Sequence, residues 1–169
     1  QGWTLAWYSV GAEFAAGRPG TSKLQVAEES IVSTELVTFR GKKFQDVRTA
    51  RNRAGKEGIR AVWTTWNDAG TMIRSQIRAL SEEWVSDKSL PEMGFTLGNL
   101  STLHDPEVRL MLALDEHDNL HGVTSWLPVY EDGALAGWML DFMRRDPAGF
   151  RPVVEFLIAE TLVQAHEDG

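Results

Sequence analysis

Three apolar segments separated by short polar turns constrain the fold of this chain most strongly. Residues 108–114, 121–130 and 136–143 each carry the pattern of a strand. The polar run 115–119 joins the first two. The second pair is joined by a turn containing Asp132 and Gly133, a dipeptide that favours the positive backbone angles of a tight hairpin. The pattern predicts an antiparallel meander of three strands.

Helical patterns stand on both sides of this meander. An amphipathic helix is predicted over about residues 71–85, and a last helix is expected after Pro147, with Pro152 in its first turn. The apolar stripe of the first helix, which we interpret as core, consists of Ile73, Ile77, Leu80 and Trp84. The expected buried face of the last helix consists of Val154, Leu157, Ile158, Thr161, Leu162 and Ala165.

The remaining segments complete a mixed fold. Strands are expected at residues 59–66, 24–32 and 95–97, and Gly- or Pro-containing loops at 11–23 and 88–92. Residues 3–10 fit either a short strand or a leading segment. The order indicates an α+β fold with helices packed on a mainly antiparallel sheet. We expect one domain over residues 1–169, with a leading segment and loop at residues 1–23.

Composition limits the kinds of site that this chain can hold. The 169 residues contain no cysteine, which excludes disulfides, thiolate metal sites and a cysteine nucleophile. No apolar run approaches the roughly 20 residues that cross a bilayer, and no signal peptide is visible. These features predict a soluble, intracellular chain. Because its first residue is Gln1 rather than Met, we expect it to be part of a longer polypeptide.

Positive charge is concentrated between residues 40 and 60. This stretch holds eight Lys or Arg residues and two acidic residues, a local charge of +6, whereas the whole chain carries −7. The rest of the chain therefore carries −13. Such segregation is typical of a surface that binds an anion, and the ordinary alternative is a solvated cationic helix.

The basic stretch also has helical periodicity, and Gly41 and Gly58 suit its two ends. Its apolar face, predicted to contact the core, consists of Phe44, Val47, Ala50 and Ala54. The candidate residues for a nucleic-acid or phosphate-bearing partner are Lys42, Lys43, Arg48, Asn52 and Lys56. The last three follow one another at i, i+4 and i+8 on a different face.

Asp141 is the most unusual charged residue, because it lies in an otherwise apolar strand where an unpaired carboxylate is costly. Arg144, three residues on, is the nearest cation. Two roles fit this pair, and the sequence leaves both open. One is a structural ion pair at the rim of the sheet, and the other is binding of a polar or amino-bearing substrate.

No other catalytic pattern emerges from the chain. His117 and His121 have a spacing found in metal sites, but they flank a predicted turn, so we interpret them as surface residues. His104 and His166 stand alone. Nucleophile-elbow, Walker A and paired-glycine dinucleotide motifs are absent from the sequence. We assign no metal site and no catalytic base.

The predicted order of elements is compatible with the GCN5-related acyltransferase fold. Members that use acetyl-CoA carry a glycine-rich loop for the pyrophosphate between the meander and the following helix. This chain offers only Gly149 there. We therefore expect no acetyl-CoA and no other cofactor.

Four segments carry a more specific signal, within a resemblance that runs from about residue 24 to residue 159. They are Gly41-Lys-Lys-Phe-Gln-Asp-Val-Arg-Thr-Ala-Arg-Asn-Arg-Ala, Phe95-Thr-Leu-Gly-Asn-Leu, Gly122-Val-Thr-Ser-Trp-Leu-Pro and Leu140-Asp-Phe-Met-Arg-Arg. Together, and in this order, they resemble the phosphatidylglycerol lysyltransferases, which are also called lysylphosphatidylglycerol synthetases or multiple peptide resistance factors.

The resemblance implies two tandem acyltransferase-like folds attached to a transmembrane part, at the cytoplasmic face of the cell membrane. It implies transfer of an aminoacyl group, lysyl first, from charged tRNA to phosphatidylglycerol, which gives resistance to cationic antimicrobial peptides. Asp141 and Arg144 match the Asp-x-x-Arg pair that the family associates with the aminoacyl moiety. Arg48, Asn52 and Lys56 would then face the tRNA acceptor end or a lipid phosphate.

The resemblance also implies that the chain is a truncated copy of the tandem pair. A cut sheet edge invites pairing, so a homodimer is one option. Three alternatives stay open. They are an aminoacyl-tRNA-dependent transferase acting on a peptide or peptidoglycan precursor, a non-catalytic tRNA- or lipid-binding module, and, as a minor option, an acetyl-CoA acyltransferase.

Overall fold

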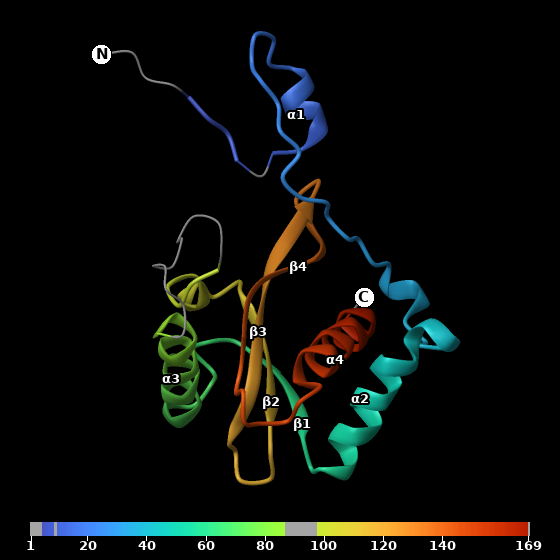
Figure 1. Cartoon of the computed structure of the whole chain (residues 1–169), viewed down its shortest axis with the longest axis vertical. Coiled ribbons are helices and arrows are strands. Elements are labelled where there is room, and N and C mark those ends of the chain that lie inside the picture. The colour runs from blue at the N-terminus through green and yellow to red at the C-terminus, as the bar shows by residue number, and fades with distance from the viewer. Residues whose placement is uncertain (1–4, 9, 87–97, 169) are drawn as a thin grey trace. The chain divides into compact units, whose positions relative to one another are not determined.

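The computed structural model describes residues 5–8, 10–86 and 98–168, and the chain divides into two compact units, residues 1–33 and 34–169 (Figure 1). The first unit contains one short helix, α1 (Ala12–Ala16). In the second unit, where η denotes a short 3₁₀ helix, the elements are η1 (Thr34–Leu36), η2 (Lys42–Phe44), α2 (Gln45–Lys56), β1 (Arg60–Thr64), α3 (Thr71–Ser86), η3 (Thr102–His104), β2 (Arg109–Leu114), β3 (Leu120–Glu131), β4 (Ala134–Arg145) and α4 (Val153–Asp168).

The second unit is built on a four-stranded sheet in the order β1-β2-β3-β4, in which every pair is antiparallel. The last three strands form the predicted meander. At the β2–β3 turn, the backbone N–H of Asp115 donates to the carbonyl oxygen of Asn119 at 3.1 Å. At the β3–β4 turn, Asp132 and Gly133 have φ angles of 50° and 81°, as the dipeptide predicts. The predicted α+β architecture is confirmed.

Helices cover both faces of the sheet (Figure 1). Strand β2 shows the division, because its alternate side chains enter different apolar clusters. Met111 and Ala113 pack with α2 and α4, whereas Leu110 and Leu112 pack with α3. We call these two sides of the sheet the α2/α4 face and the α3 face.

The helices of the second unit form close to where the sequence predicts them. Gly41 and Gly58, with φ angles of 91° and 70°, bound the segment that contains η2 and α2. Ala50 and Ala54 of the predicted core stripe are fully buried, and so is Ile77 in α3. No helix among the described residues is long and apolar enough to cross a membrane.

Helix α4 begins one residue after Pro152, whose carbonyl oxygen accepts the N–H of Phe156 at 3.1 Å. Leu157 and Thr161 are buried as predicted, and the rest of the predicted face is partly buried. The helix packs against both the sheet and α2, so burial extends beyond one stripe. Its buried residues are Val153, Phe156, Leu157, Ala159 and Thr161.

Two predictions for the first unit are wrong. Residues 24–32 form no strand, and Leu24 and Ile31 are 84% and 89% exposed. The described part of that unit contains no partner strand, so an apolar pattern alone cannot form a ladder there. The predicted loop 11–23 contains α1. The strand expected at 95–97 and the loop expected at 88–92 lie outside the described residues.

Candidate functional site

A β-bulge in β4 sets the direction of Asp141. Two residues of β4, Asp141 and Phe142, lie opposite the single residue Ser125 of β3. The backbone N–H of Phe142 donates to the Ser125 hydroxyl at 3.1 Å, and both residues are fully buried. An extra residue of this kind interrupts the alternation of side chains along a strand. The flanking pairs are Leu140 with Trp126 and Met143 with Thr124.

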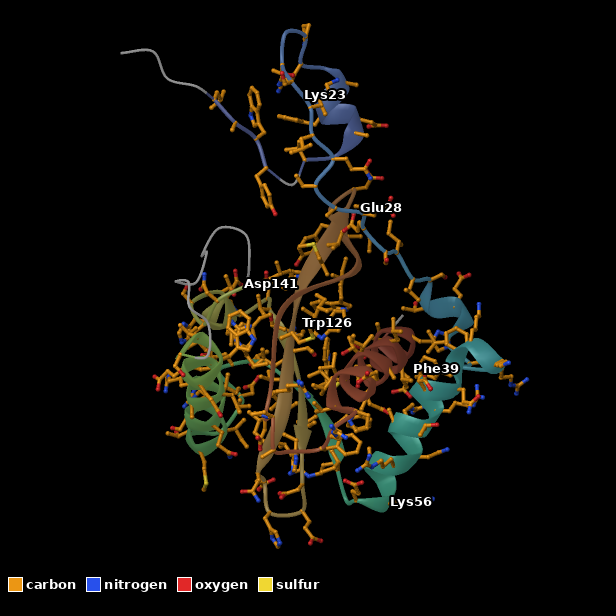
Figure 2. The ribbon with its side chains drawn as sticks, in the orientation of Figure 1. Lys23, Glu28, Phe39, Lys56, Trp126 and Asp141 are labelled. Atoms are coloured by element: carbon orange, nitrogen blue, oxygen red, sulfur yellow. The ribbon has the colours of Figure 1, made fainter. Side chains whose placement is uncertain are left out.

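The bulge brings Asp141 and Arg144 to the same face of the sheet. Three residues apart on a regular strand, they would point to opposite faces. Here Phe142 joins the apolar cluster of α3, and Arg144 contacts Trp84 of α3. Asp141, labelled in Figure 2, contacts Thr102, and both the acidic and the basic residue therefore belong to the α3 face.

Arg144 is a buried cation held between two aromatic rings. It is 5% exposed, and its Cζ lies 3.8 Å from the ring centre of Trp84 and 4.2 Å from that of Phe142. Its Nη1 donates to the carbonyl oxygen of Met143 at 2.9 Å. Stacking on aromatic faces stabilises a guanidinium that has lost water. Asp141 and Arg144 form no ion pair with each other. The structural ion pair, one of the two roles that the sequence left open, is therefore not observed between these two residues.

The Asp141 carboxylate is half-buried and keeps acceptor capacity. Its Oδ2 lies 3.3 Å from the Thr102 hydroxyl, which is closer, at 2.7 Å, to the carbonyl oxygen of Asn99. Because one hydroxyl proton serves both acceptors, the bond to the carboxylate is the weaker one. A carboxylate has about four lone-pair sites, so Asp141 can still accept hydrogen bonds from an ammonium group of a ligand.

Gly98 lets the segment after α3 approach Asp141 closely. A Cβ atom at residue 98 would lie 2.5 Å from Oδ2 of Asp141 and 2.8 Å from its backbone carbonyl carbon, which are distances that real Cβ atoms avoid. Any other residue at 98 would therefore push the segment away from the carboxylate.

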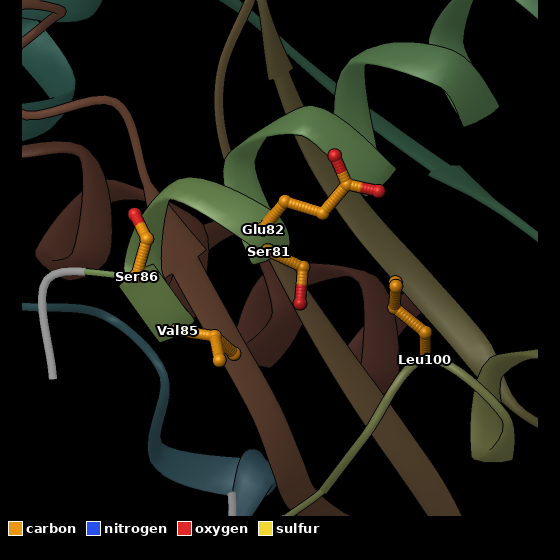
Figure 3. A pocket seen from close by; sticks show the side chains of 5 residues that line it. All are labelled: Ser81, Glu82, Val85, Ser86 and Leu100. Atoms are coloured by element: carbon orange, nitrogen blue, oxygen red, sulfur yellow. The ribbon is translucent and has the colours of Figure 1, made fainter. Parts of the chain in front are cut away.

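An open pocket of about 350 Å³ lies between the last turns of α3 and this same segment (Figure 3). Its walls include the apolar side chains of Val85 and Leu100, together with three polar side chains. Leu100 of this pocket lies two residues along the chain from Gly98 and from Thr102, the two contacts of Asp141. The polar side chains that line it are Ser81, Glu82 and Ser86.

The basic helix lies on the opposite side of the sheet, in the α2/α4 layer. Of the predicted anion-binding residues, Lys42, Lys43, Asn52 and Lys56 are exposed, and Lys56 stands at the end of α2 (Figure 2). Three other cations of the stretch are already paired, and one of them is Arg60, which pairs with Asp118. Arg51 donates to Glu160 at 2.6 Å, and Arg53 to Glu57 at 2.5 Å.

Arg48 has a structural role at the start of this helix. Its Nη1 donates to the carbonyl oxygens of Phe39 and Gly41, at 2.6 Å and 2.7 Å. The side chain is half-buried, and it fixes the chain that leads into η2. The prediction of an anion-binding surface therefore depends mainly on the three lysines and Asn52.

His121 is half-buried and bonded to the backbone, in contrast to our interpretation of it as a surface residue. Its Nδ1 accepts the backbone N–H of Phe150 at 2.9 Å, so Nε2 carries the proton, 3.7 Å from Oδ2 of Asp115. His117 is exposed in the turn, as predicted. Within the described residues, no group of three His, Cys, Asp or Glu side chains could hold a metal ion.

Comparison with known proteins identifies the family. The family profile described as "Phosphatidylglycerol lysyltransferase, C-terminal" matches residues 1–169. The chain belongs to this family. The predicted resemblance to phosphatidylglycerol lysyltransferases is therefore confirmed, over a longer range than residues 24–159.

Two sequence relatives show how much of a longer protein this family member covers. An uncharacterized protein of Corynebacterium glutamicum is 57% identical over 99% of this chain, which covers 21% of that protein. The lysylphosphatidylglycerol biosynthesis bifunctional protein LysX of Nocardia farcinica is 28% identical over 99% of the chain, which covers 15% of it. The chain thus spans about a fifth or less of the curated relatives that it matches.

Two solved structures support the fold. L-PGS from Bacillus licheniformis matches with a TM-score of 0.68 and 22% identity, over 82% of this chain and 41% of that one. The C-terminal domain of a putative lysylphosphatidylglycerol synthetase from Agrobacterium fabrum matches with a TM-score of 0.65 and 15% identity, over 82% and 42%. The predicted acyltransferase-like fold of this phosphatidylglycerol lysyltransferase family member is confirmed.

Several residues of the site could not have been assigned from the sequence. Trp84 was part of a helical stripe that we interpreted as core, and its contact with Arg144 depends on the position of β4 relative to α3. Thr102 and Gly98 contact Asp141 from about 40 positions away. The Phe95–Leu100 segment of the family resemblance was the one sequence signal near them.

Proposed function

We propose that the protein containing this chain transfers an aminoacyl group, lysyl first, from charged tRNA to phosphatidylglycerol at the cytoplasmic face of the membrane. The observation that carries the proposal is the site on the α3 face. There a half-buried carboxylate with remaining acceptor capacity lies on the same face as a buried guanidinium and close to an open pocket. Membership of the family supplies the class of reaction.

The reaction requires positioning more than a strong nucleophile, because an aminoacyl-tRNA is already an activated ester. The hydroxyl oxygen of the lipid attacks the ester carbonyl carbon, and the bond from that carbon to the tRNA ribose oxygen breaks. The proton of the lipid hydroxyl goes to the leaving ribose oxygen. No cofactor is needed for this exchange of one ester for another.

Asp141 has the chemistry to orient the aminoacyl group. Its carboxylate would accept hydrogen bonds from the α-ammonium, and such charge-assisted bonds are shorter and stronger than neutral ones. Arg144 supplies a fixed positive charge on the same face, and its stacking between Trp84 and Phe142 keeps it in place. The two residues would hold the acyl donor while the lipid hydroxyl approaches.

Helix α2 would bind the tRNA. Lys56 of α2 is exposed, and so are Lys42 and Lys43 of η2 just before it, whereas the rest of the chain is acidic and repels phosphates. Asn52 lies on the same helix and is also exposed. A nucleic-acid backbone would therefore make its contacts at α2, and binding would weaken as salt concentration rises.

The product explains a cellular role in resistance to cationic antimicrobial peptides. Phosphatidylglycerol carries a negative charge, and a lysyl ester adds two ammonium groups to it. The membrane surface then attracts polybasic peptides less strongly, because that attraction depends on anionic headgroups.

An Asp141→Asn substitution in the full-length protein tests the site. We expect lysyl transfer from tRNA to phosphatidylglycerol to fall about 10- to 100-fold in kcat/KM, because a hydrogen bond to a charged group contributes about 1.5–3 kcal/mol. Asp132→Asn, an identical change at the exposed β3–β4 turn, is the control and should leave the rate unchanged. Equal rates in the two variants would contradict the assignment of Asp141.

A Lys56→Glu substitution tests the role of α2. It should raise the KM for lysyl-tRNA and reduce the salt dependence of binding. Lys23→Glu makes the same change of charge in the first unit and is the control. Transfer to a peptide acceptor in place of the lipid, or tRNA binding with no transfer to any acceptor, would refute the proposed reaction.

A further inference from the structure

Two unusual backbone conformations stand just before the basic helix. Phe39 has a φ angle of 49°, in the left-handed region that a bulky side chain rarely adopts, and it is only 5% exposed. Two residues later, Gly41 has φ and ψ angles of 91° and 170°, a combination that is essentially confined to glycine. Backbone of this kind persists where surrounding contacts fix it, and it is concentrated at functional sites.

A single nitrogen atom of Arg48 fixes both positions. Its Nη1 donates to the carbonyl oxygens of Phe39 and Gly41, at 2.6 Å and 2.7 Å, and bonds from a charged donor are among the strong ones. The carbonyl oxygen of Gly41 also accepts the N–H of Phe44 at 3.3 Å, so the same turn begins η2. Arg48 therefore holds residues 39–41 against the first turn of α2.

The buried ring of Phe39 connects this turn to an exposed lysine. Phe39, labelled in Figure 2, packs edge-on against Phe44, with the ring centres 5.9 Å apart. The ammonium of Lys43 lies 4.9 Å from the centre of the Phe44 ring. On Phe39 itself lies the guanidinium of Arg51, with Cζ 5.4 Å from the ring centre, and Arg51 also pairs with Glu160 of α4. The position of Lys43 thus depends on the rings that the turn packs together.

We propose that Arg48 is a positioning residue for tRNA binding. It holds the turn at residues 39–41, so that Lys42 and Lys43 face the phosphates of the tRNA. The geometry of the guanidinium is what the surface needs, because a lysine side chain is one covalent bond shorter and ends in a compact ammonium. The inference rests on the proposed function, and it changes the role of Arg48 from a direct contact with the tRNA to a support for the two lysines of η2.

The first test keeps every charge and changes only the shape of the cation. Arg48→Lys is compared with Arg53→Lys, the same substitution on the same helix at an exposed residue that pairs with Glu57. Binding of deacylated lysine tRNA to the full-length protein is measured over a series of salt concentrations. We expect Arg48→Lys to weaken binding about five- to tenfold, and to lower the slope of log K against log salt by about one for each lysine contact that is lost. Arg53→Lys should leave both unchanged.

The second test changes the same turn through the backbone alone. Gly41→Ala is compared with Gly55→Ala, within α2. Apart from its chain neighbours, a Cβ atom at either glycine would meet no described atom within 4 Å, so only the backbone angles of Gly41 distinguish the two sites. Gly41→Ala should weaken tRNA binding as Arg48→Lys does, whereas Gly55→Ala should not. Melting temperatures of all variants are compared, so that a loss of binding can be told from a loss of folding.

A double-mutant cycle separates positioning from a general loss of stability. Lys42→Gln and Lys43→Gln together should weaken tRNA binding in the otherwise unchanged protein. The same pair of changes should have a much smaller effect in the Arg48→Lys variant, because its lysines are already displaced. A role of Arg48 in stability alone would leave the two effects additive.

Four results would overturn the inference. These are unchanged affinity and salt slope in Arg48→Lys, equal losses in Arg48→Lys and Arg53→Lys, equal affinities of the Gly41 and Gly55 variants, and additive effects in the cycle. Lysyl transfer from tRNA to phosphatidylglycerol is measured on the same preparations. Any of the four results with normal transfer by the unchanged protein would refute the positioning role alone. Binding of tRNA without transfer to the lipid would refute the proposed reaction and leave the role of Arg48 intact, and no binding of tRNA by the unchanged protein would refute both.

Discussion

A Ser125→Ala substitution tests whether the bulge in β4 depends on one hydroxyl group. Ser125 is completely buried, and its Oγ accepts the backbone N–H of Phe142 at 3.1 Å. Alanine fills nearly the same space without the acceptor. The N–H group of Phe142 would then be buried without a partner at the point where β4 carries its extra residue.

The expected loss of stability follows from that unsatisfied donor. Leaving a buried backbone donor unpaired costs about 1–3 kcal/mol. For a unit of this size, each kcal/mol lowers Tm by about 3–5 °C. Ser125→Ala should therefore melt several degrees below the unchanged protein. Amide hydrogen exchange at Phe142 should accelerate more than at other residues of β4, because the effect begins there.

The control is Ser75→Ala on the exposed side of α3. The Ser75 hydroxyl donates to the carbonyl oxygen of Thr71 within the same helix, so its removal leaves no buried donor unpaired. We expect a change within about 0.5 kcal/mol. If Ser125→Ala matched this control in Tm and in exchange at Phe142, the hydroxyl would not be what holds the bulge, and our explanation of the direction of Asp141 would be wrong.

Two further predictions concern the β2–β3 turn. His121→Ala should lower the free energy of unfolding by about 1–3 kcal/mol, because the buried N–H of Phe150 loses its acceptor. His117→Ala, at an exposed position of the same turn, is the control and should have little effect in chemical denaturation. Equal effects of the two substitutions would contradict the role assigned to His121. Hydrogen bonds from the Asn119 side chain, with smaller contributions from backbone N–H groups, lower the pKa of Asp115 from 3.8 to about 2. Since the pKa is lowered in the folded state, this stabilisation is present above about pH 4 and is lost as pH falls towards 2. A carbon-13 NMR titration of the Asp115 carboxyl should give a midpoint near pH 2 in the unchanged protein and a midpoint closer to 3.8 in Asn119→Ala. The same midpoint in both proteins would refute the Asn119 hydrogen bond as the cause.

The sequence predicted the second unit well because local signals and tertiary packing agree there. Gly58 has the positive φ angle expected just after the end of a helix, and the Asp132-Gly133 turn closes the expected hairpin. Ala50 and Ala54 are buried as their spacing requires. Such agreement between local preference and the global fold is what makes a prediction from one sequence reliable.

The failures have a different origin, since each depends on a contact that is distant in sequence. Residues 24–32 have a strand pattern, but the described residues of the first unit offer no strand to pair with them. His121 was interpreted as a turn residue, and its burial depends on the chain returning at Phe150. The direction of Asp141 depends on the bulge opposite Ser125, which no spacing within β4 alone reveals.

The separation of the basic helix from Asp141 decides which ligand suits each surface under the proposed function. Helix α2 packs on one face of the sheet and Asp141 belongs to the other. Packed layers lie about 10 Å apart, so a ligand that contacts both must extend around the sheet. A single lipid headgroup is too short for this, whereas a tRNA that ends in an extended acceptor strand is not. We therefore assign α2 to tRNA, and expect Lys56→Glu to raise the KM for lysyl-tRNA and not that for phosphatidylglycerol. A higher KM for phosphatidylglycerol with an unchanged KM for lysyl-tRNA would instead assign α2 to binding of the lipid.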